Sequence, residues 1–150
     1  MPSLFPTFEV PTQLAEDVHL ERLYRPGPLW DLEKGDFIFD GARRPLYGSG
    51  YDEWVTWCIK AIMTERWGHY GYSGDMGIEA EDAFKQPDRK AQESALIRTI
   101  TEALLADPMG RTRQVRDFQF KWYADELEIT CVIYGNQGDS NTLKVKLRNF

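Results

Sequence analysis

The alternation of apolar and polar residues in the last third of the chain constrains the fold most strongly. It appears in two runs: Leu127, Ile129, Cys131 and Ile133 in the first, and Leu143, Val145 and Leu147 in the second. This period of two is typical of strands that bury one face. A polar loop from Gly135 to Asn141 separates the two runs. The pattern therefore predicts two antiparallel strands whose apolar face other elements must cover.

A third strand and two helices complete the predicted core. Residues 115–122 form a strand with an irregularity near Arg116 and Asp117, and Ala124-Asp125 makes the turn to the next strand. A helix is predicted from Asp52 to Arg66, where Ser49 and Asp52 resemble a capping box. A second helix runs from Arg89 to Ala106 and stops before Pro108. The fold class is α+β, with a small antiparallel sheet packed by two main helices.

The N-terminal part is predicted to be less regular. Residues 1–25 are rich in proline and show no clear period, so we expect an arm that orders against a partner. Residues 26–150 form the predicted single domain. It opens with a hairpin from Leu29 to Tyr47 that turns at Asp40-Gly41 and returns through Pro45 as an edge strand.

Charge and composition exclude several classes of function. The net charge is −6 and the sequence pI is about 5.0. Nucleic acids and anionic membranes attract basic surfaces, so neither is expected as a partner. No stretch is long and apolar enough to span a bilayer. Cys58 and Cys131 fall on predicted apolar faces and are expected to be reduced core thiols.

The sequence offers no catalytic, cofactor-binding or metal-binding motif. His19 and His69 lack metal-ligand spacing with either cysteine, and the glycines near residue 70 do not follow a strand. One alternative is a cluster of acidic residues around the tyrosine-glycine loop: Glu65, Asp75, Glu79, Glu81 and Asp82. A carboxylate pair can hydrolyse a glycosidic bond. The competing interpretation is a solvated acidic surface with salt bridges to Arg66 or Arg89.

Short segments from Leu29 to Gly135 resemble, in order and spacing, a contractile-tail baseplate family of PBSX-like prophages. The segments are Trp30 to Phe37, Trp54, Trp57 to Ala61, Thr64 to Arg66, Tyr72-Ser73, Gly77 to Glu79, Glu81-Asp82, Thr101 to Pro108, Val115, and Asp117-Phe118. That family is similar in turn to the sheath-initiator baseplate wedge proteins of contractile phages, long labelled lysozyme-like. The resemblance implies a structural role in a baseplate and no catalysis.

The resemblance also implies two contacts. Sheath initiators carry a Glu-Pro-Arg motif after the second helix that touches the baseplate wedge. Asp107 and Pro108 match it here, but Met109 replaces the arginine, so Arg111 or Arg113 is expected to serve instead. The first sheath ring adds strands to the initiator's sheet, which is β-augmentation.

Two hypotheses about partner-binding residues follow. The edge that receives the sheath is either the final strand from Thr142 to Arg148, with Leu143, Val145 and Leu147, or its neighbour from Glu126 to Ile133. We expect a proline at Val145 to block sheath assembly while the chain stays soluble. We also expect an exposed charged turn from Asp107 to Arg113, where substitution of Arg111 and Arg113 weakens wedge binding; a plain helix stop is the competing reading.

Three classes of function therefore stand at this point. The first is a structural baseplate component that links the wedge to the first sheath ring, located in a tail particle assembled in the bacterial cytoplasm. The resemblance implies six copies per ring, with the sheath, the wedge and the tail tube or hub as partners. The second is a peptidoglycan-cleaving, lysozyme-like hydrolase of the tail. The third is a small acidic adaptor unrelated to tails, which would not explain the matched segments.

Overall fold

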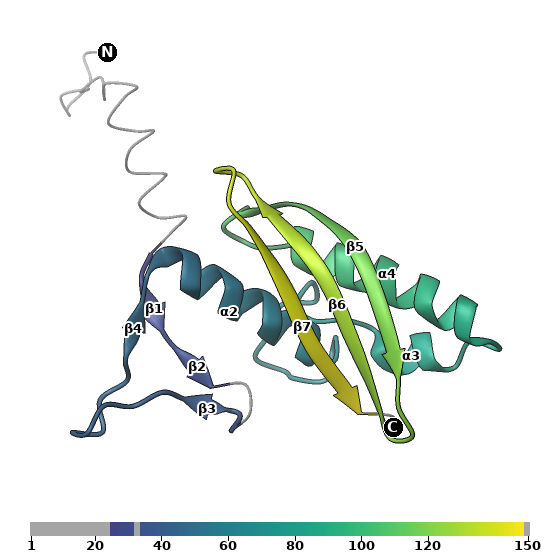
Figure 1. Cartoon of the computed structure of the whole chain (residues 1–150), viewed down its shortest axis with the longest axis horizontal. Helices are drawn as coiled ribbons and strands as arrows, with labels where there is room; N and C mark the ends of the chain where they lie inside the picture. Colours follow the sequence, from purple (N-terminus) through teal and green to yellow (C-terminus); the bar gives the residue numbers. More distant parts are fainter. Residues whose placement is uncertain (1–24, 32–33, 149–150) are drawn as a thin grey trace, which may run out of the picture.

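The computed structural model describes residues 25–31 and 34–148 of the chain, and its centre is a three-stranded antiparallel sheet. The strands are β5 (Thr112–Trp122), β6 (Glu126–Gly135) and β7 (Ser140–Arg148), in the spatial order β5-β6-β7. Two long helices, α2 (Gly50–Met63) and α4 (Arg89–Leu105), lie on one face of this sheet (Figure 1). The α+β prediction is confirmed. The predicted arm lies outside the described residues, apart from Arg25.

The core fills the space between the two helices and the sheet. From α2 it takes Trp54, Cys58, Ala61 and Ile62, and from α4 it takes Leu96, Ile100, Ala103 and Leu104. The sheet contributes the alternating residues of both predicted runs. Cys58 and Cys131 are free and buried, as predicted. Burial raises the pKa of Cys58 to about 12 and that of Cys131 to about 11, so both thiols stay protonated at neutral pH.

Helix α2 begins where its capping box predicts. The Ser49 hydroxyl accepts a hydrogen bond from the Asp52 N–H, and the Asp52 carboxylate accepts one from the Ser49 N–H. The helix ends at Met63, earlier than the predicted Arg66, because Thr64 is already extended. Residues 64–66 then bond to Ile78, and Gly77 is required there: its φ is +96°, and a Cβ would lie 2.5 Å from the Thr64 carbonyl oxygen.

The N-terminal segment forms two short strand pairs where the sequence predicts one hairpin. Strand β1 (Gly27–Pro28) pairs with β4 (Tyr47–Gly48), and β2 (Trp30–Asp31) pairs with β3 (Asp36–Phe37). The predicted turn at Asp40 is present, closed by a bridge between Phe39 and Pro45. Its positive φ falls on Arg43 and not on Gly41. The segment continues into α2, and its ribbons lie beside the N-terminal end of that helix (Figure 1).

The remaining elements agree closely with the sequence. A short helix α3 (Ala80–Phe84) precedes α4, whose N-cap is Asp88. Strand β5 has a register shift between Arg116 and Gln119, and Asp117 has a φ of +58°, which is the irregularity that the sequence predicts. The β5–β6 turn lies at Ala124-Asp125, where the Tyr123 N–H donates to the Glu126 carbonyl at 2.9 Å.

Candidate functional site

Strand β7 is an edge of the sheet. Among the residues that the structure describes, β6 is its only strand partner, so the outer side of β7 is unpaired. Its apolar residues Leu143, Val145 and Leu147 are buried toward the helices, while Lys144, Lys146 and Arg148 are exposed on the other face. An unpaired edge of this length is a template for another strand.

The central position of β6 corrects one of the two edge hypotheses. Residues Glu126 to Tyr134 of β6 pair with β7, and Leu127 to Gly135 pair with β5. Both sides of β6 are therefore occupied, and its alternation reflects burial at the centre of the sheet. The prediction that Glu126 to Ile133 forms the receiving edge is wrong, because an edge strand and its central neighbour show the same period in sequence.

The hairpin geometry indicates which backbone groups of β7 face outward. The Gly135 N–H donates to the Asp139 carbonyl at 2.7 Å, so this pair is hydrogen-bonded. Hydrogen-bonded and non-hydrogen-bonded pairs alternate along an antiparallel ladder. Following the register, Leu143, Val145 and Leu147 direct their N–H and C=O groups toward β6. Thr142, Lys144, Lys146 and Arg148 direct theirs outward.

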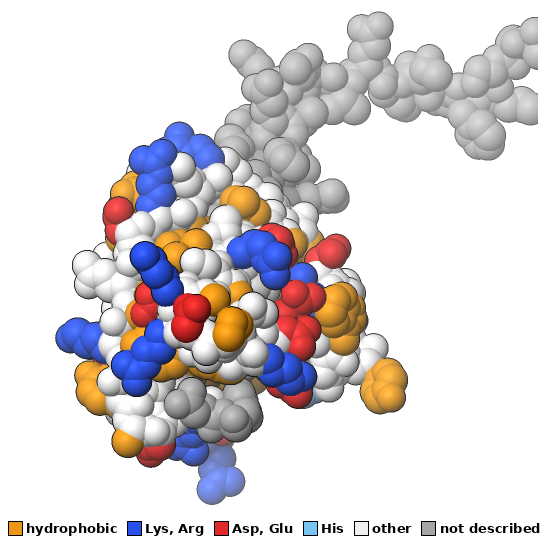
Figure 2. All heavy atoms as spheres, turned by 90° about the vertical axis from the view of Figure 1, so that its right-hand side faces the viewer, with side chains coloured by type: hydrophobic (Ala, Val, Ile, Leu, Met, Phe, Trp, Pro, Cys, Tyr) orange, Lys and Arg blue, Asp and Glu red, His pale blue; other side chains and the backbone are white. Residues whose placement is uncertain are grey.

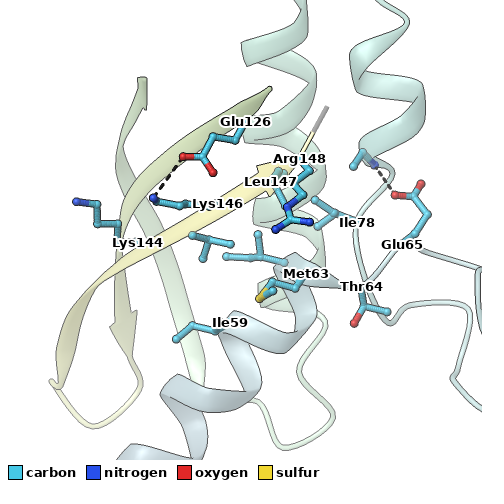
Figure 3. A pocket seen from close by; sticks show the side chains of 13 residues that line it. Ile59, Met63, Thr64, Glu65, Ile78, Glu126, Lys144, Lys146, Leu147 and Arg148 are labelled. Carbon is cyan, nitrogen blue, oxygen red and sulfur yellow. Dashed lines mark hydrogen bonds and ion pairs between the residues drawn. The ribbon is translucent and has the colours of Figure 1, made fainter. Parts of the chain in front are cut away.

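A shallow groove runs along the β7 edge, between that strand and α2. Its larger part has a volume of about 630 Å³ and is lined by Met63, Thr64 and Leu147 (Figure 3). The charged side chains of Glu126, Lys144, Lys146 and Arg148 also border it. A smaller hollow of about 230 Å³ continues past Trp30, Val55 and Asn141, and Ile59 borders both. The larger hollow borders residues 144–148 of β7, and the smaller one touches this strand at Asn141. The groove therefore offers both apolar and charged surface beside unpaired backbone groups, and Met63 is 52% exposed there.

Charges on the outer face of the sheet are arranged in columns of alternating sign. Lys121 of β5 stands opposite Glu128 of β6. On the other side of β6, Lys144 binds Glu128 and Lys146 binds Glu126, each at 3.3 Å. These cross-strand pairs stabilise the sheet. The last column, on β7, is basic.

The turn predicted to bind the wedge is instead organised around a buried ion pair. The side chains of Asp107 and Arg111 are 1% and 2% exposed, and the Arg111 Nε lies 2.7 Å from an Asp107 carboxylate oxygen. Arg111 also binds Glu53 of α2, and its guanidinium lies over the Trp57 ring. Burial lowers the pKa of Arg111, but the bonds and charges of Asp107 and Glu53 outweigh this and raise it.

This geometry corrects the prediction of an exposed charged turn at Asp107 and Arg111. Arg111 is an internal clasp that ties the end of α4 and the start of β5 to α2, and it has no free face for a partner. The exposed residues of this segment are Pro108, Met109, Gly110 and Arg113. Sequence reasoning missed the third member of the clasp, Glu53, because it lies on the polar stripe of α2, distant in sequence. The pairing of Asp107 with Arg111 could have been predicted from the sequence, because the two residues are four positions apart.

The acidic cluster has structural roles in this fold. Glu65 accepts hydrogen bonds from the N–H groups of Ala80 and Glu81 at the start of α3, at 3.2 and 3.4 Å. Arg66 lies within ion-pair distance of Glu79 and Glu102. Burial raises the pKa of Glu65, partly offset by the two N–H bonds. These contacts agree with the interpretation of the cluster as surface salt bridges.

Other kinds of site are not apparent in the described residues. Within 25–31 and 34–148, no three or more His, Cys, Asp or Glu side chains are grouped to hold a metal ion. His69 is exposed beside Tyr72, and His19 lies outside the described residues. No helix in this part of the chain is long and apolar enough to cross a membrane. On the face shown in Figure 2, basic, acidic and hydrophobic side chains are interspersed, so this face carries no continuous patch of one sign.

Comparison with known proteins agrees with the sequence resemblance. The model of a family described as contractile injection system sheath initiator matches residues 28–138, which is most of the 150-residue chain. The match contains the helices, β5, β6 and the turn after α4, and it ends just before β7. No curated protein matches the sequence. The chain therefore belongs to the sheath initiators of contractile injection systems, which are structural components of a tail particle.

Proposed function

We propose that this sheath initiator links the baseplate wedge to the first sheath ring, and that its β7 edge receives an extended segment of the sheath protein. The observation that carries the proposal is the unpaired β7 edge beside the groove between that strand and α2. Strand addition supplies affinity through backbone hydrogen bonds, and side chains entering the groove set the register.

The particle context is part of the same proposal. The chain acts at the baseplate of a tail particle assembled in the bacterial cytoplasm. Six copies around the ring would match the symmetry that the family resemblance implies, with the tail tube or hub as a further neighbour.

A double proline substitution tests the strand addition directly. In Thr142→Pro/Lys146→Pro, two backbone N–H groups that point away from β6 are lost. The hydrogen bonds from β7 to β6 remain, because Leu143, Val145 and Leu147 make them. The matched control is Thr142→Ala/Lys146→Ala, which removes the same side chains and keeps both N–H groups. We expect unsheathed tails with the proline variant and sheathed tails with the alanine variant, counted by electron microscopy.

The proline test also requires that both variants stay folded. Their thermal unfolding midpoints should lie within a few degrees of the parent protein. Sheathed tails at normal number in the proline variant would contradict the assignment of β7 as the receiving edge.

We propose that the wedge contacts the exposed part of the turn after α4. Pro108 and Arg113 are exposed on either side of Arg111, whose buried ion pair with Asp107 holds this segment in place. Arg113 lies at the start of β5, and an exposed arginine at a fixed strand end suits a bidentate contact to a partner carboxylate. Arg113→Ala should reduce recovery of wedge proteins in an affinity pulldown, whereas Arg116→Ala, an exposed neighbour on β5, should not. Equal recovery with both variants would refute this role of Arg113.

We infer further that the chain acts without catalysis. Glu65 and Glu79, the strongest candidates for a hydrolytic pair, are engaged by α3 and by Arg66. The purified protein should not clear a suspension of bacterial cell walls. Clearing that Glu65→Gln abolishes would instead support the hydrolase.

A further inference from the structure

We propose that the segment received by β7 alternates apolar residues with acidic ones, so that its carboxylates form the next column of charge on the sheet. This inference rests on the proposed strand addition and specifies the chemistry of the incoming strand. It commits to one occupant, an extended segment of the sheath subunit.

Charged side chains of alternating sign lie side by side on the three strands of the sheet. The face of the sheet that points away from the helices runs from basic on β5, at Lys121, to acidic on β6, at Glu126 and Glu128, to basic on β7. Neighbouring strands in a sheet are stabilised by opposite charges and destabilised by like charges directly across from each other. A strand added beside β7 on this face would therefore be favoured by carboxylates.

The basic side chains of β7 retain capacity for such a partner. Lys144 and Lys146 each bind one glutamate, yet their side chains are 62% and 57% exposed. An ammonium group has three donors, so each lysine can also donate a hydrogen bond to a second carboxylate. Within the described residues, Arg148 has no carboxylate at ion-pair distance.

The opposite face of the incoming strand would meet the groove. Successive side chains of a strand point to opposite faces, so every second residue would face α2. There the groove presents Val55, Ile59 and Met63, spaced by four residues along one side of the helix. Apolar side chains entering it would cover the exposed surface of Met63. The expected segment thus has apolar residues toward the helix and acidic residues toward Lys144, Lys146 and Arg148.

The net charge of the chain lets an experiment distinguish specific binding of an acidic segment from nonspecific attraction. The net charge is −6, so nonspecific attraction favours a basic partner segment. The probes are two capped synthetic peptides of eight residues, one alternating glutamate with valine and one alternating lysine with valine. Amide chemical shifts of the labelled protein are followed by NMR during titration. We expect the glutamate peptide to shift the amides of Thr142, Lys144 and Lys146, and the lysine peptide to leave them unchanged.

Neutralisation of the basic column tests the same chemistry with the sheath subunit itself. The triple variant Lys144→Gln/Lys146→Gln/Arg148→Gln should bind the sheath subunit about tenfold more weakly, as expected when three cross-strand charge pairs are lost. The matched control, Lys90→Gln/Arg98→Gln/Arg116→Gln, removes three exposed cations elsewhere and should bind like the parent protein.

The outcomes separate this inference from the proposed function. If the proline variant fails to nucleate sheath but the glutamine triple binds normally, strand addition stands and the acidic segment is wrong. If neither variant affects the sheath, the β7 assignment itself is wrong. Equal or stronger shifts with the lysine peptide, or shifts with neither peptide, would also overturn the acidic segment.

Discussion

The two edges of the sheet, β5 and β7, differ in how regularly they pair with β6 and in what lies beside them. Strand β7 keeps one unbroken register with β6 from Ser140 to Arg148, whereas β5 shifts register twice. Each edge strand packs against one helix, β5 against α4 and β7 against α2, and the groove lies between β7 and α2. Bulges are one device that protects an edge from unwanted pairing. The contrast indicates that β7 is the more regular template for an added strand.

The β5 edge is also anchored more firmly at its start. The Arg111 clasp precedes β5 directly, and the hydroxyl of Thr112 accepts a hydrogen bond from the Trp54 indole at 2.9 Å. At the other end of the strand, the Trp122 indole donates to Glu93 of α4 at 2.8 Å. Strand β7 is tied near its beginning, where the Tyr51 hydroxyl donates to the Ser140 carbonyl at 3.0 Å. The open edge therefore lies on a strand with fewer side-chain ties to the helices.

Removal of the clasp should have the largest effect on stability. Arg111→Ala leaves the Asp107 carboxylate buried without its partner, which costs about 3–5 kcal/mol for ion pairs of this kind. Urea unfolding measures the loss. The control is Arg113→Ala, an exposed arginine two residues away, which should change stability by less than about 0.5 kcal/mol. Similar losses in the two variants would contradict the internal role of Arg111.

Proline substitutions at adjacent positions should distinguish the two sides of β7. Val145→Pro removes an N–H that faces β6 and a buried side chain, so we expect a loss of about 2–4 kcal/mol. Lys146→Pro removes an outward N–H and should cost about 1 kcal/mol or less. This corrects the sequence-based choice of Val145 for a proline test, because that variant would damage the sheet itself. Equal unfolding midpoints for the two variants would show that the assignment of inward and outward N–H groups on β7 is wrong.

The bulge in β5 should respond to the residue at position 117. Asp117 has a φ of +58°, which glycine adopts without strain and a β-branched residue strongly resists. We expect Asp117→Gly to match or raise stability by up to about 1 kcal/mol, and Asp117→Val to lower it by about 1–2 kcal/mol. Thermal unfolding of the pair tests this. A more stable valine variant would mean that β5 is regular at this edge.

Glu65, at the rim of the groove, should give the smallest effect, seen only as a dependence on pH. Burial raises its folded-state pKa above the ordinary value of 4.5, so the folded protein holds this proton more tightly than the unfolded chain. The stabilising contribution is complete below about pH 4.5 and is lost as the pH rises through the folded-state value. Relative to the parent protein, Glu65→Gln should therefore gain stability over that range. If the curves of unfolding free energy against pH stay parallel for the parent protein and Glu65→Gln, this expectation is contradicted. The control is Asp125→Asn, in an exposed turn.

Much of the fold could be predicted because its signals are local. The capping box at Ser49, the stop at Pro108, the turn at Ala124 and the alternation of β6 and β7 each depend on a few neighbouring residues. The early end of α2 was missed because it depends on Ile78, which is distant in sequence and bonds to Thr64 and Arg66. Such long-range pairing overrides the helical period of the segment.

The candidate site could be predicted only in part, for the same physical reason. Alternation indicates a strand, but it does not indicate which strand lies at the edge, so β6 and β7 were equivalent in sequence. Arg111 could be identified as important, yet its burial depends on Glu53 and Trp57, more than fifty residues earlier. The groove could not be predicted, since it is defined by the distance between α2 and β7.

Hydrogen exchange of the β7 amides tests the central claim most directly. In the free protein, the amides of Leu143 and Val145 should be protected by β6, while those of Lys144 and Lys146 should exchange fast. After assembly with the sheath subunit, Lys144 and Lys146 should become protected to a similar degree. Protection that appears on β5 while the outward amides of β7 still exchange fast would contradict the account.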